Sequence, residues 1–162
     1  MLRTTVLLMF LSMGALQAQD VIEVASAKRA ASLAAEVFYL ARDVGDRMSQ
    51  HLIGAEVDYD PAEWDEVIRL ADEAVVLNPH MHQPRSAKLF ALVATERKGE
   101  DEIRDCALEI LEVYADDIPA LVVLVEYHRI HGNDDQVLQY KERALEVDPG
   151  LGPALDLILM GD

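Results

Sequence analysis

The sequence predicts an all-α protein built from helix hairpins that repeat along the chain. Helix-favouring Ala, Leu, Val and Glu dominate the composition, and only 6% of the residues are aromatic. Apolar residues recur at helical spacing in several segments. A short segment ending in Asn-Pro returns 70 residues later ending in Asp-Pro, a distance of twice 35. With 162 residues, of which 51% are hydrophobic and 27% charged, the chain is expected to form one globular domain and not a disordered one.

The first 18 residues have the order of a secretory signal peptide. Arg3 supplies a positive start, residues 6–11 are an unbroken apolar run, and Gln-Ala-Gln-Asp follows at 17–20. The apolar stretch is much shorter than the roughly 20 residues of a spanning helix. Cleavage is therefore expected after Ala18, and stable membrane insertion is not. An uncleaved anchor or a buried helix is the alternative. No cysteine follows the region, which excludes a bacterial lipoprotein anchor.

The charge of the chain excludes some partners. The net charge is −16, and removing residues 1–18 removes one positive side chain, Arg3, which leaves −17. Such a surface repels phosphate backbones and anionic lipid, so nucleic acid is not an expected partner. It suits basic partners or divalent cations, and solubility alone also explains it.

Cysteine usage indicates the compartment. Cys106 is the single cysteine, so no internal disulfide can form. The chain also has no Asn-x-Ser/Thr glycosylation site, since Asn78 precedes Pro79 and Asn133 precedes Asp134. Small secreted eukaryotic domains tend to be rich in disulfides. The expected location is therefore periplasmic or secreted, with a bacterial source favoured.

The repeat has a period of about 34 residues. Residues 74–79 (Ala-Val-Val-Leu-Asn-Pro) match residues 144–149 (Ala-Leu-Glu-Val-Asp-Pro), and Pro-Ala-Leu occurs at both 119–121 and 153–155, a shift of 34. Each unit is expected to contain two helices. In the last unit these are 119–130 and 135–147, separated by a break at Gly132 and ended by Asp148-Pro149. The middle unit runs from about 85 to 114 with a break at 98–100, and the first shows its second helix at 61–77.

This pattern resembles the tetratricopeptide repeat, a helix-turn-helix unit of about 34 residues with a closing Ala-x-x-x-Asp/Asn-Pro. Ala74 to Pro79 and Ala144 to Pro149 match the closing motif, Gly132 matches the glycine between the helices, and Trp64 stands where the family often has an aromatic residue. The resemblance covers about residues 45–162. It implies a right-handed solenoid of antiparallel helix hairpins, about three units long.

The chain departs from the family pattern at several positions. Leu92 and Val125 stand where the family prefers a small residue, Leu121 replaces a large aromatic residue, and the middle unit closes with Ala115-Asp116 in place of Asp-Pro. Helix pairs are therefore expected to pack at altered angles, and an unrelated helical bundle is the alternative.

The two ends of residues 19–162 are expected to cap the repeats. Residues 19–57 form an N-terminal helical segment, one long helix or two, which Gly45 and Gly54 divide or end. Residues 58–162 hold the repeats, and a short apolar helix at 153–160 closes them, because stacked units bury their faces only against neighbours. A self-association helix is the other interpretation of 19–57.

Three groups of residues have metal-ligand chemistry. Asp58, Asp60 and Glu63 offer oxygen ligands for calcium, but acidic residues at a helix start also favour the macrodipole. His80-Met81-His82 offers two imidazoles and a thioether for copper or zinc, with no third ligand indicated. The third group is His128 with His131, which lie three residues apart on a helix.

No catalytic constellation is present. Cys106 falls inside a helix and is expected to be a buried thiol. No Ser-His-Asp arrangement, P-loop or glycine-rich dinucleotide turn occurs. The chain is therefore not expected to be an enzyme, and no cofactor is expected.

The family resemblance implies a concave groove, lined by the first helices of successive units, that binds a peptide or a partner helix. The corresponding positions here are Leu89, Val93, Glu96, Arg97, Val122, Glu126 and Arg129. The alternative is that these residues pack against the N-terminal helix. The predicted function is an exported, non-catalytic interaction or scaffold module for a protein or peptide. An exported accessory protein that binds Ca, Zn or Cu is the alternative.

Overall fold

The computed structural model describes the backbone of residues 2–95 and 99–160 and the side chains of residues 23–95 and 99–160. Within these ranges the regular structure is helical, and the prediction of an all-α protein is confirmed. The elements are α1 (Leu2–Leu52), α2 (Glu63–Leu77), α3 (His82–Thr95), α4 (Glu100–Val113), α5 (Ile118–Ile130), α6 (Asp134–Val147), the 3-10 turn η1 (Pro149–Leu151) and α7 (Gly152–Met160).

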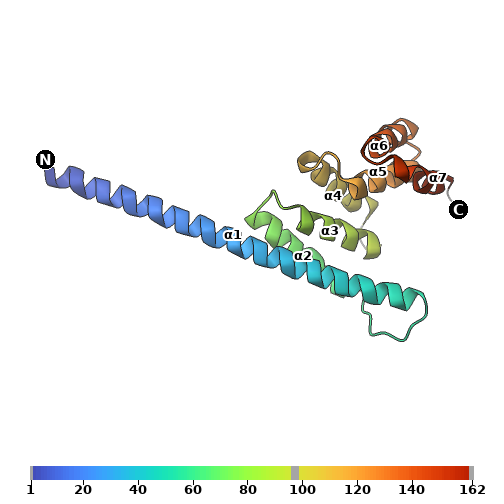
Figure 1. The fold of residues 1–162 in the computed structure, drawn as a ribbon, viewed down its shortest axis with the longest axis horizontal. Helices are drawn as coiled ribbons and strands as arrows, with labels where there is room; N and C mark the ends of the chain where they lie inside the picture. Colours follow the sequence, from blue (N-terminus) through green and yellow to red (C-terminus); the bar gives the residue numbers. More distant parts are fainter. Residues whose placement is uncertain (1, 96–98, 161–162) are drawn as a thin grey trace.

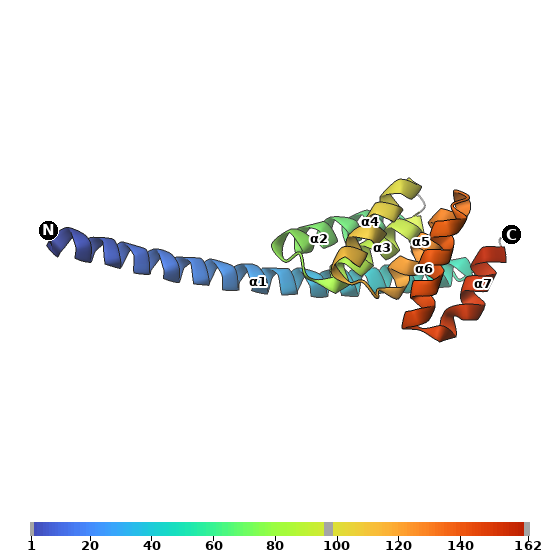
Figure 2. The same ribbon diagram turned by 90° about the horizontal axis from the view of Figure 1, so that it is seen from above.

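Each helix packs on the next one along the chain, as Figure 1 shows. α1 is followed by a turn, and α2 runs back along it. The C-terminal half of α1 contacts both α2 and α3. Its N-terminal half extends away from the other helices in both views (Figures 1 and 2). Residues 19–52 of the predicted helical segment 19–57 thus belong to a single helix that crosses Gly45 without a break, and residues 53–57 follow its end.

Two glycines end helices by the same hydrogen-bonded turn. Gly54 (φ +83°) follows α1, and Gly132 (φ +66°) follows α5. After α1, the N–H of Gly54 donates to the carbonyl of His51 and that of Ala55 to Gln50, at 2.9 and 3.0 Å. After α5, the N–H of Gly132 donates to the carbonyl of Arg129 and that of Asn133 to the carbonyl of His128. This is the Schellman arrangement, in which glycine adopts the left-handed conformation at no steric cost.

Proline and aspartate set other boundaries. α6 ends at Val147, and Asp148, which precedes Pro149, has an extended backbone (φ −140°, ψ 99°) as predicted. Asp117 caps α5, since its carboxylate accepts from the N–H of Ala120 at 2.8 Å, and Pro119 occupies the first turn. These local signals place helix ends close to where the sequence indicates them.

The core runs continuously from α1 to α7. Trp64 of α2 is fully buried, and its indole N–H donates to the Tyr59 hydroxyl at 3.2 Å. A Cβ placed on Gly45 would lie 3.5 Å from the Phe90 ring and 3.8 Å from Trp64, which are ordinary contact distances, so these rings pack close to α1 at this position. The other buried hydrophobic residues include Leu33, Val37, Val44, Val67, Leu92, Ile110, Leu121, Leu124 and Leu155.

The packing of α1 on the body of the molecule, the bundle formed by α2 to α7, begins near residue 29. Val24 is 55% exposed, whereas Ala30 is fully buried. Arg29 forms an ion pair with Glu73 of α2 at 3.3 Å. The predicted signal peptide and its cleavage position after Ala18 fall on residues whose side chains lie outside the described part. Among the residues that the structure describes, no helix combines the length and apolar character needed to cross a membrane.

Candidate functional site

The candidate site is an open hollow of about 290 Å³ between α3, α4, α5 and α7. Its surface is almost entirely apolar. Two of the lining residues, Glu100 and Glu126, are charged, and both are acidic. The remaining lining residues are Val93 of α3, Ile103 of α4, Val122, Val123, Tyr127 and Ile130 of α5, and Ile158 of α7.

Three of the predicted groove residues lie together here: Val93, Val122 and Glu126. Arg129 does not line the hollow. Its guanidinium instead binds both carboxylate oxygens of Glu126, at 2.7 and 2.8 Å. Glu96 and Arg97 lie outside the described residues.

Leu89 is not part of an open surface, because it is only 2% exposed. Val93, one helical turn later on the same face of α3, is 43% exposed. The same face is therefore covered in the middle of α3 and open near its C-terminal end. The helical phase taken from the resemblance puts Leu89 and Val93 on one face of α3, but it does not indicate how far along the helix that face is covered by neighbours.

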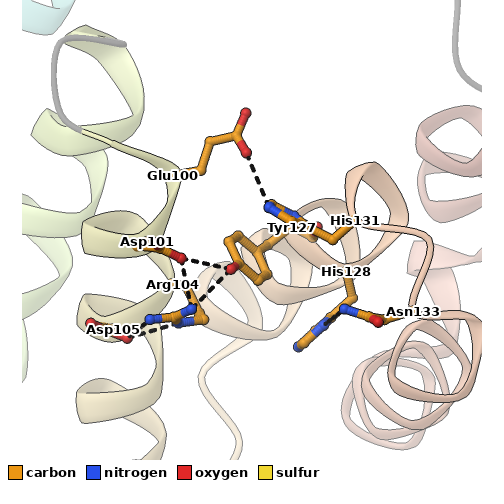
Figure 3. Close-up of polar contacts among 8 residues, drawn as sticks. All are labelled: Glu100, Asp101, Arg104, Asp105, Tyr127, His128, His131 and Asn133. Atoms are coloured by element: carbon orange, nitrogen blue, oxygen red, sulfur yellow. Dashed lines mark hydrogen bonds and ion pairs between the residues drawn. The ribbon is translucent and has the colours of Figure 1, made fainter.

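Tyr127 forms one wall of the hollow and is held from α4 (Figure 3). Its hydroxyl donates to Asp101 at 2.8 Å and accepts from Arg104 at 2.9 Å. The Arg104 guanidinium also pairs with Asp101 and Asp105, both at 2.7 Å. The hydrogen bond to Asp101, followed by burial, raises the pKa of Tyr127. The phenol therefore stays protonated at neutral pH and cannot act as a base there.

His131 stacks on the other side of this tyrosine, with ring centroids 4.2 Å apart. Its Nδ1 lies 2.8 Å from the Tyr127 carbonyl oxygen, so Nδ1 carries a proton. Its Nε2 lies 3.5 Å from the Glu100 carboxylate (Figure 3). A neutral ring has no second proton to give to Glu100, so this pair is a full ion pair only when the imidazole is doubly protonated.

His128 and His131 are not brought together as a metal site. The His128 ring lies parallel to Tyr140 of α6 at 5.5 Å and contacts the Asn133 amide at 3.4 Å. Burial, followed by the nearby charges of His131 and Arg104, lowers the pKa of His128. The two imidazoles therefore serve different helix contacts, one toward α4 and one toward α6.

The His80-Met81-His82 segment is used in packing. His82 begins α3, and its Nε2 lies 2.5 Å from the carboxylate of Asp117, whose side chain is 2% exposed. The His82 ring meets Tyr114 edge-on at 4.7 Å, and the Tyr114 hydroxyl donates to the carbonyl of His80. The contact between His82 and Asp117, which are 35 residues apart, joins the start of α3 to the start of α5.

The acidic turn before α2 is tied to α1. Asp60 accepts from the N–H of Ala62, two residues on, at 2.8 Å, as in an Asx turn. Arg47 of α1 pairs with Glu63 through both of its terminal nitrogens and donates to the carbonyl of Asp58 at 2.9 Å. Within residues 23–95 and 99–160, no three potential ligands of the His, Cys, Asp or Glu type come together in a way that could hold a metal ion.

Cys106 is buried, as predicted, at 6% exposure. Burial raises the pKa of its thiol to about 11, from an ordinary value of 9.0. A nucleophilic cysteine needs the opposite shift. Cys106 therefore behaves as a small core residue.

A second, more polar hollow of about 360 Å³ lies between α1 and α3. Phe38 and Phe90, which are 50% and 48% exposed, face it together with Arg42, His82 and Gln83.

No known protein-family model matches the chain, and no curated protein matches it. The assignment of a function therefore depends on the geometry described above.

Proposed function

We propose that the chain is a non-catalytic helix-hairpin module that binds a peptide or a partner helix in the hollow between α3, α4, α5 and α7. The observation that carries the proposal is the hollow itself. It is lined by half-exposed aliphatic side chains, among them Val93 and Ile130 at 43% and 52% exposure. Exposed aliphatic surface gathered in a concavity is typical of an interaction site.

The proposal includes a tetratricopeptide-like solenoid. Consecutive packing of α1 to α6, the glycine-ended α5 and the Asp-Pro end of α6 support it. In this arrangement α1 with α2, α3 with α4, and α5 with α6 are the three hairpins, and α7 covers the end. Leu92 and Val125 are fully buried at positions where the family prefers small residues. In the proposed solenoid, larger side chains therefore separate the helices at these positions.

The proposed location is outside the cytoplasm, after removal of residues 1–18. The order of charges and apolar residues in that segment supports export. The packing of α1 is compatible with this cleavage, because its ion pair with the body is formed by Arg29 and its burial begins near Ala30.

A pair of exposed isoleucine and leucine residues tests the binding site. Ile130→Asp places a charge at the hollow, whereas Leu138→Asp makes the same change on α6 at 57% exposure, away from it. Proteins captured from the native compartment by the wild-type chain should be lost with Ile130→Asp and retained with Leu138→Asp. Helical circular dichroism checks that both variants fold. Equal capture by the two variants contradicts the proposal.

A further inference from the structure

We infer that the segment bound in this hollow is an amphipathic helix that carries branched aliphatic residues flanked by Lys or Arg. This inference rests on the proposed binding function and adds the class of partner. It follows from three properties of the hollow: its apolar lining, its lack of a free side-chain hydrogen-bond donor, and the sign of its charges.

The size of the hollow limits what can fill it. At about 290 Å³ it lies just below the range of small-molecule pockets, roughly 300–1,000 Å³. Its wide mouth, between helices of the same domain, leaves any occupant partly in solvent. One or two aliphatic side chains projecting from a partner would contact Ile103, Ile130 and Ile158 at once.

The hydrogen-bonding groups favour a helix over an extended strand. An extended peptide must pair its backbone N–H and C=O groups with its receptor or with water. The lining offers no free side-chain donor to the peptide carbonyls, because the Tyr127 hydroxyl already donates to Asp101 and its other polar side chains, Glu100 and Glu126, are acceptors. The carboxylate of Glu126 is likewise bound on both oxygens by Arg129. A helix pairs its backbone N–H and C=O groups within itself and presents only side chains, so binding to this surface leaves no backbone hydrogen bond unmade.

The charges favour basic flanking residues. Glu100 and Glu126 are the charged residues that line the hollow. Glu126 is neutralised by Arg129. Among the residues that the structure describes, Glu100 pairs with a histidine ring, that of His131 at 3.5 Å, and its side chain is 59% exposed. Glu100 is therefore the carboxylate that a Lys or Arg of the partner would meet. The net charge of −16 would also attract a basic partner from a distance.

The wall beside Glu100 is already in place. Tyr127 is fixed by two hydrogen bonds to α4 and by stacking on His131, with Arg104 located 5.3 Å from its ring centroid (Figure 3). Binding therefore does not require this wall to become ordered, which lowers the entropic cost of association.

The test uses two designed peptides of about 16 residues, long enough to form a helix. Both carry Leu and Ile at i, i+4 and i+7, one with Lys at the flanking positions and the other with Glu. Binding to the purified protein is measured by fluorescence anisotropy at two salt concentrations. We expect the Lys peptide to bind about tenfold more tightly than the Glu peptide, with a difference that shrinks in high salt.

Variants of the protein assign the effect to the hollow. Ile130→Asp should weaken both peptides, and Leu138→Asp should weaken neither. Glu100→Gln should weaken the Lys peptide several-fold and leave the Glu peptide unchanged or slightly improved. Loss of the preference for Lys in Glu100→Gln supports the inference directly.

Other outcomes overturn the inference in distinguishable ways. Equal binding of both peptides, with both weakened by Ile130→Asp, removes the basic partner but leaves the proposed function intact. A proline-containing peptide of the same composition that binds as tightly removes the requirement for a helix. Sedimentation that shows a dimer disrupted by Ile130→Asp makes a second copy the occupant. Failure of both peptides, together with unchanged capture of native proteins by Ile130→Asp, removes the proposed function as well.

Discussion

The two ends of the molecule are packed differently. α2, near the N-terminal end, has six buried residues, including the fully buried Trp64, and it is clamped to α1 by the Arg47–Glu63 pair. α6, near the C-terminal end, has two, Tyr140 and Ala144, and α7 has one, Leu155. The candidate hollow lies at this second end, between α5 and α7 on one side and α3 and α4 on the other.

This difference separates stability from binding. Buried apolar area is the main favourable term in folding, and α1 and α2 hold 11 of the 24 buried hydrophobic residues of the described chain. These two helices are therefore expected to contribute a large share of the free energy of unfolding. Aliphatic side chains left half-exposed at the other end are available to a partner. A change at the first end should therefore unfold the protein, while a change at the second should affect binding first.

The largest expected effect is that of Trp64→Ala compared with Tyr140→Ala. Removing a fully buried tryptophan should lower the free energy of unfolding by about 3–5 kcal/mol. Tyr140 is 9% exposed and stacks on His128, and Tyr140→Ala should lower the free energy of unfolding by clearly less than Trp64→Ala does. Urea unfolding followed by circular dichroism measures both values. Equal costs would contradict the division into a stabilising and a binding end.

Alkaline pH tests the packing between the two ends through Cys106. Because burial raises the pKa of this thiol from 9.0 to about 11, the folded state holds the proton more tightly than the unfolded chain does. The contribution of the protonated thiol to the free energy of unfolding is fully present below about pH 9 and is lost as the pH rises to about 11. The loss should be on the order of 2 kcal/mol.

Cys106→Ala serves as the control, since other groups also titrate in this range. The difference in the free energy of unfolding between the wild type and Cys106→Ala should change between pH 9 and 11. A constant difference would mean that the thiol is not desolvated.

The next effect concerns Asp117, which joins the two ends. Asp117→Ala removes the cap of α5 and the contact with His82, and should cost about 1–2 kcal/mol. Asp117→Asn keeps an oxygen that can accept from Ala120 and should cost less. Thermal unfolding compares the two variants with the wild type, and an equal loss would show that the cap is not the main contribution.

The smallest effect has opposite signs at two glycines. Gly45→Ala should stabilise α1 by up to about 1 kcal/mol, because its Cβ would make ordinary contacts with Phe90 and Trp64 at 3.5 and 3.8 Å. Gly54→Ala should destabilise the protein, because its φ of +83° is unfavourable for alanine. Differential scanning calorimetry measures both shifts. Destabilisation by Gly45→Ala would mean that the α1–α2 packing is tighter than the structure indicates.

The sequence predicts the local boundaries of this fold well. Gly132, Pro119 and Asp148-Pro149 each act through the backbone within a few residues, and each lies at the helix end where it is expected. The continuity of α1 through Gly45 is different. A glycine costs a helix roughly 1 kcal/mol, and the packing of α1 against α2 and α3 compensates for it. Those contacts are made by α2 and α3 and cannot be seen within α1.

The candidate site is predicted only in part for a similar reason. Val93, Val122 and Glu126 follow from the phase of the first helices. Ile103 and Ile158 come from other helices, and their approach depends on the packing angles. Glu100 was one carboxylate among 30 acidic residues, and only the fold brings it to His131 and the hollow. Leu89 is buried although it shares a face of α3 with the exposed Val93. Periodicity predicts which residues share a helix face, but it does not predict which part of that face other helices bury.

The free half of α1 also determines the reach of the molecule. Residues 2–28 would form an arm of about 40 Å at 1.5 Å per residue. Cleavage after Ala18 would leave ten residues of it, about 15 Å, without breaking the Arg29–Glu73 pair. Export would thus shorten a spacer and leave the folded body as it was. The hollow is lined by residues of α3, α4, α5 and α7 and by none of α1, so shortening the arm leaves its lining unchanged.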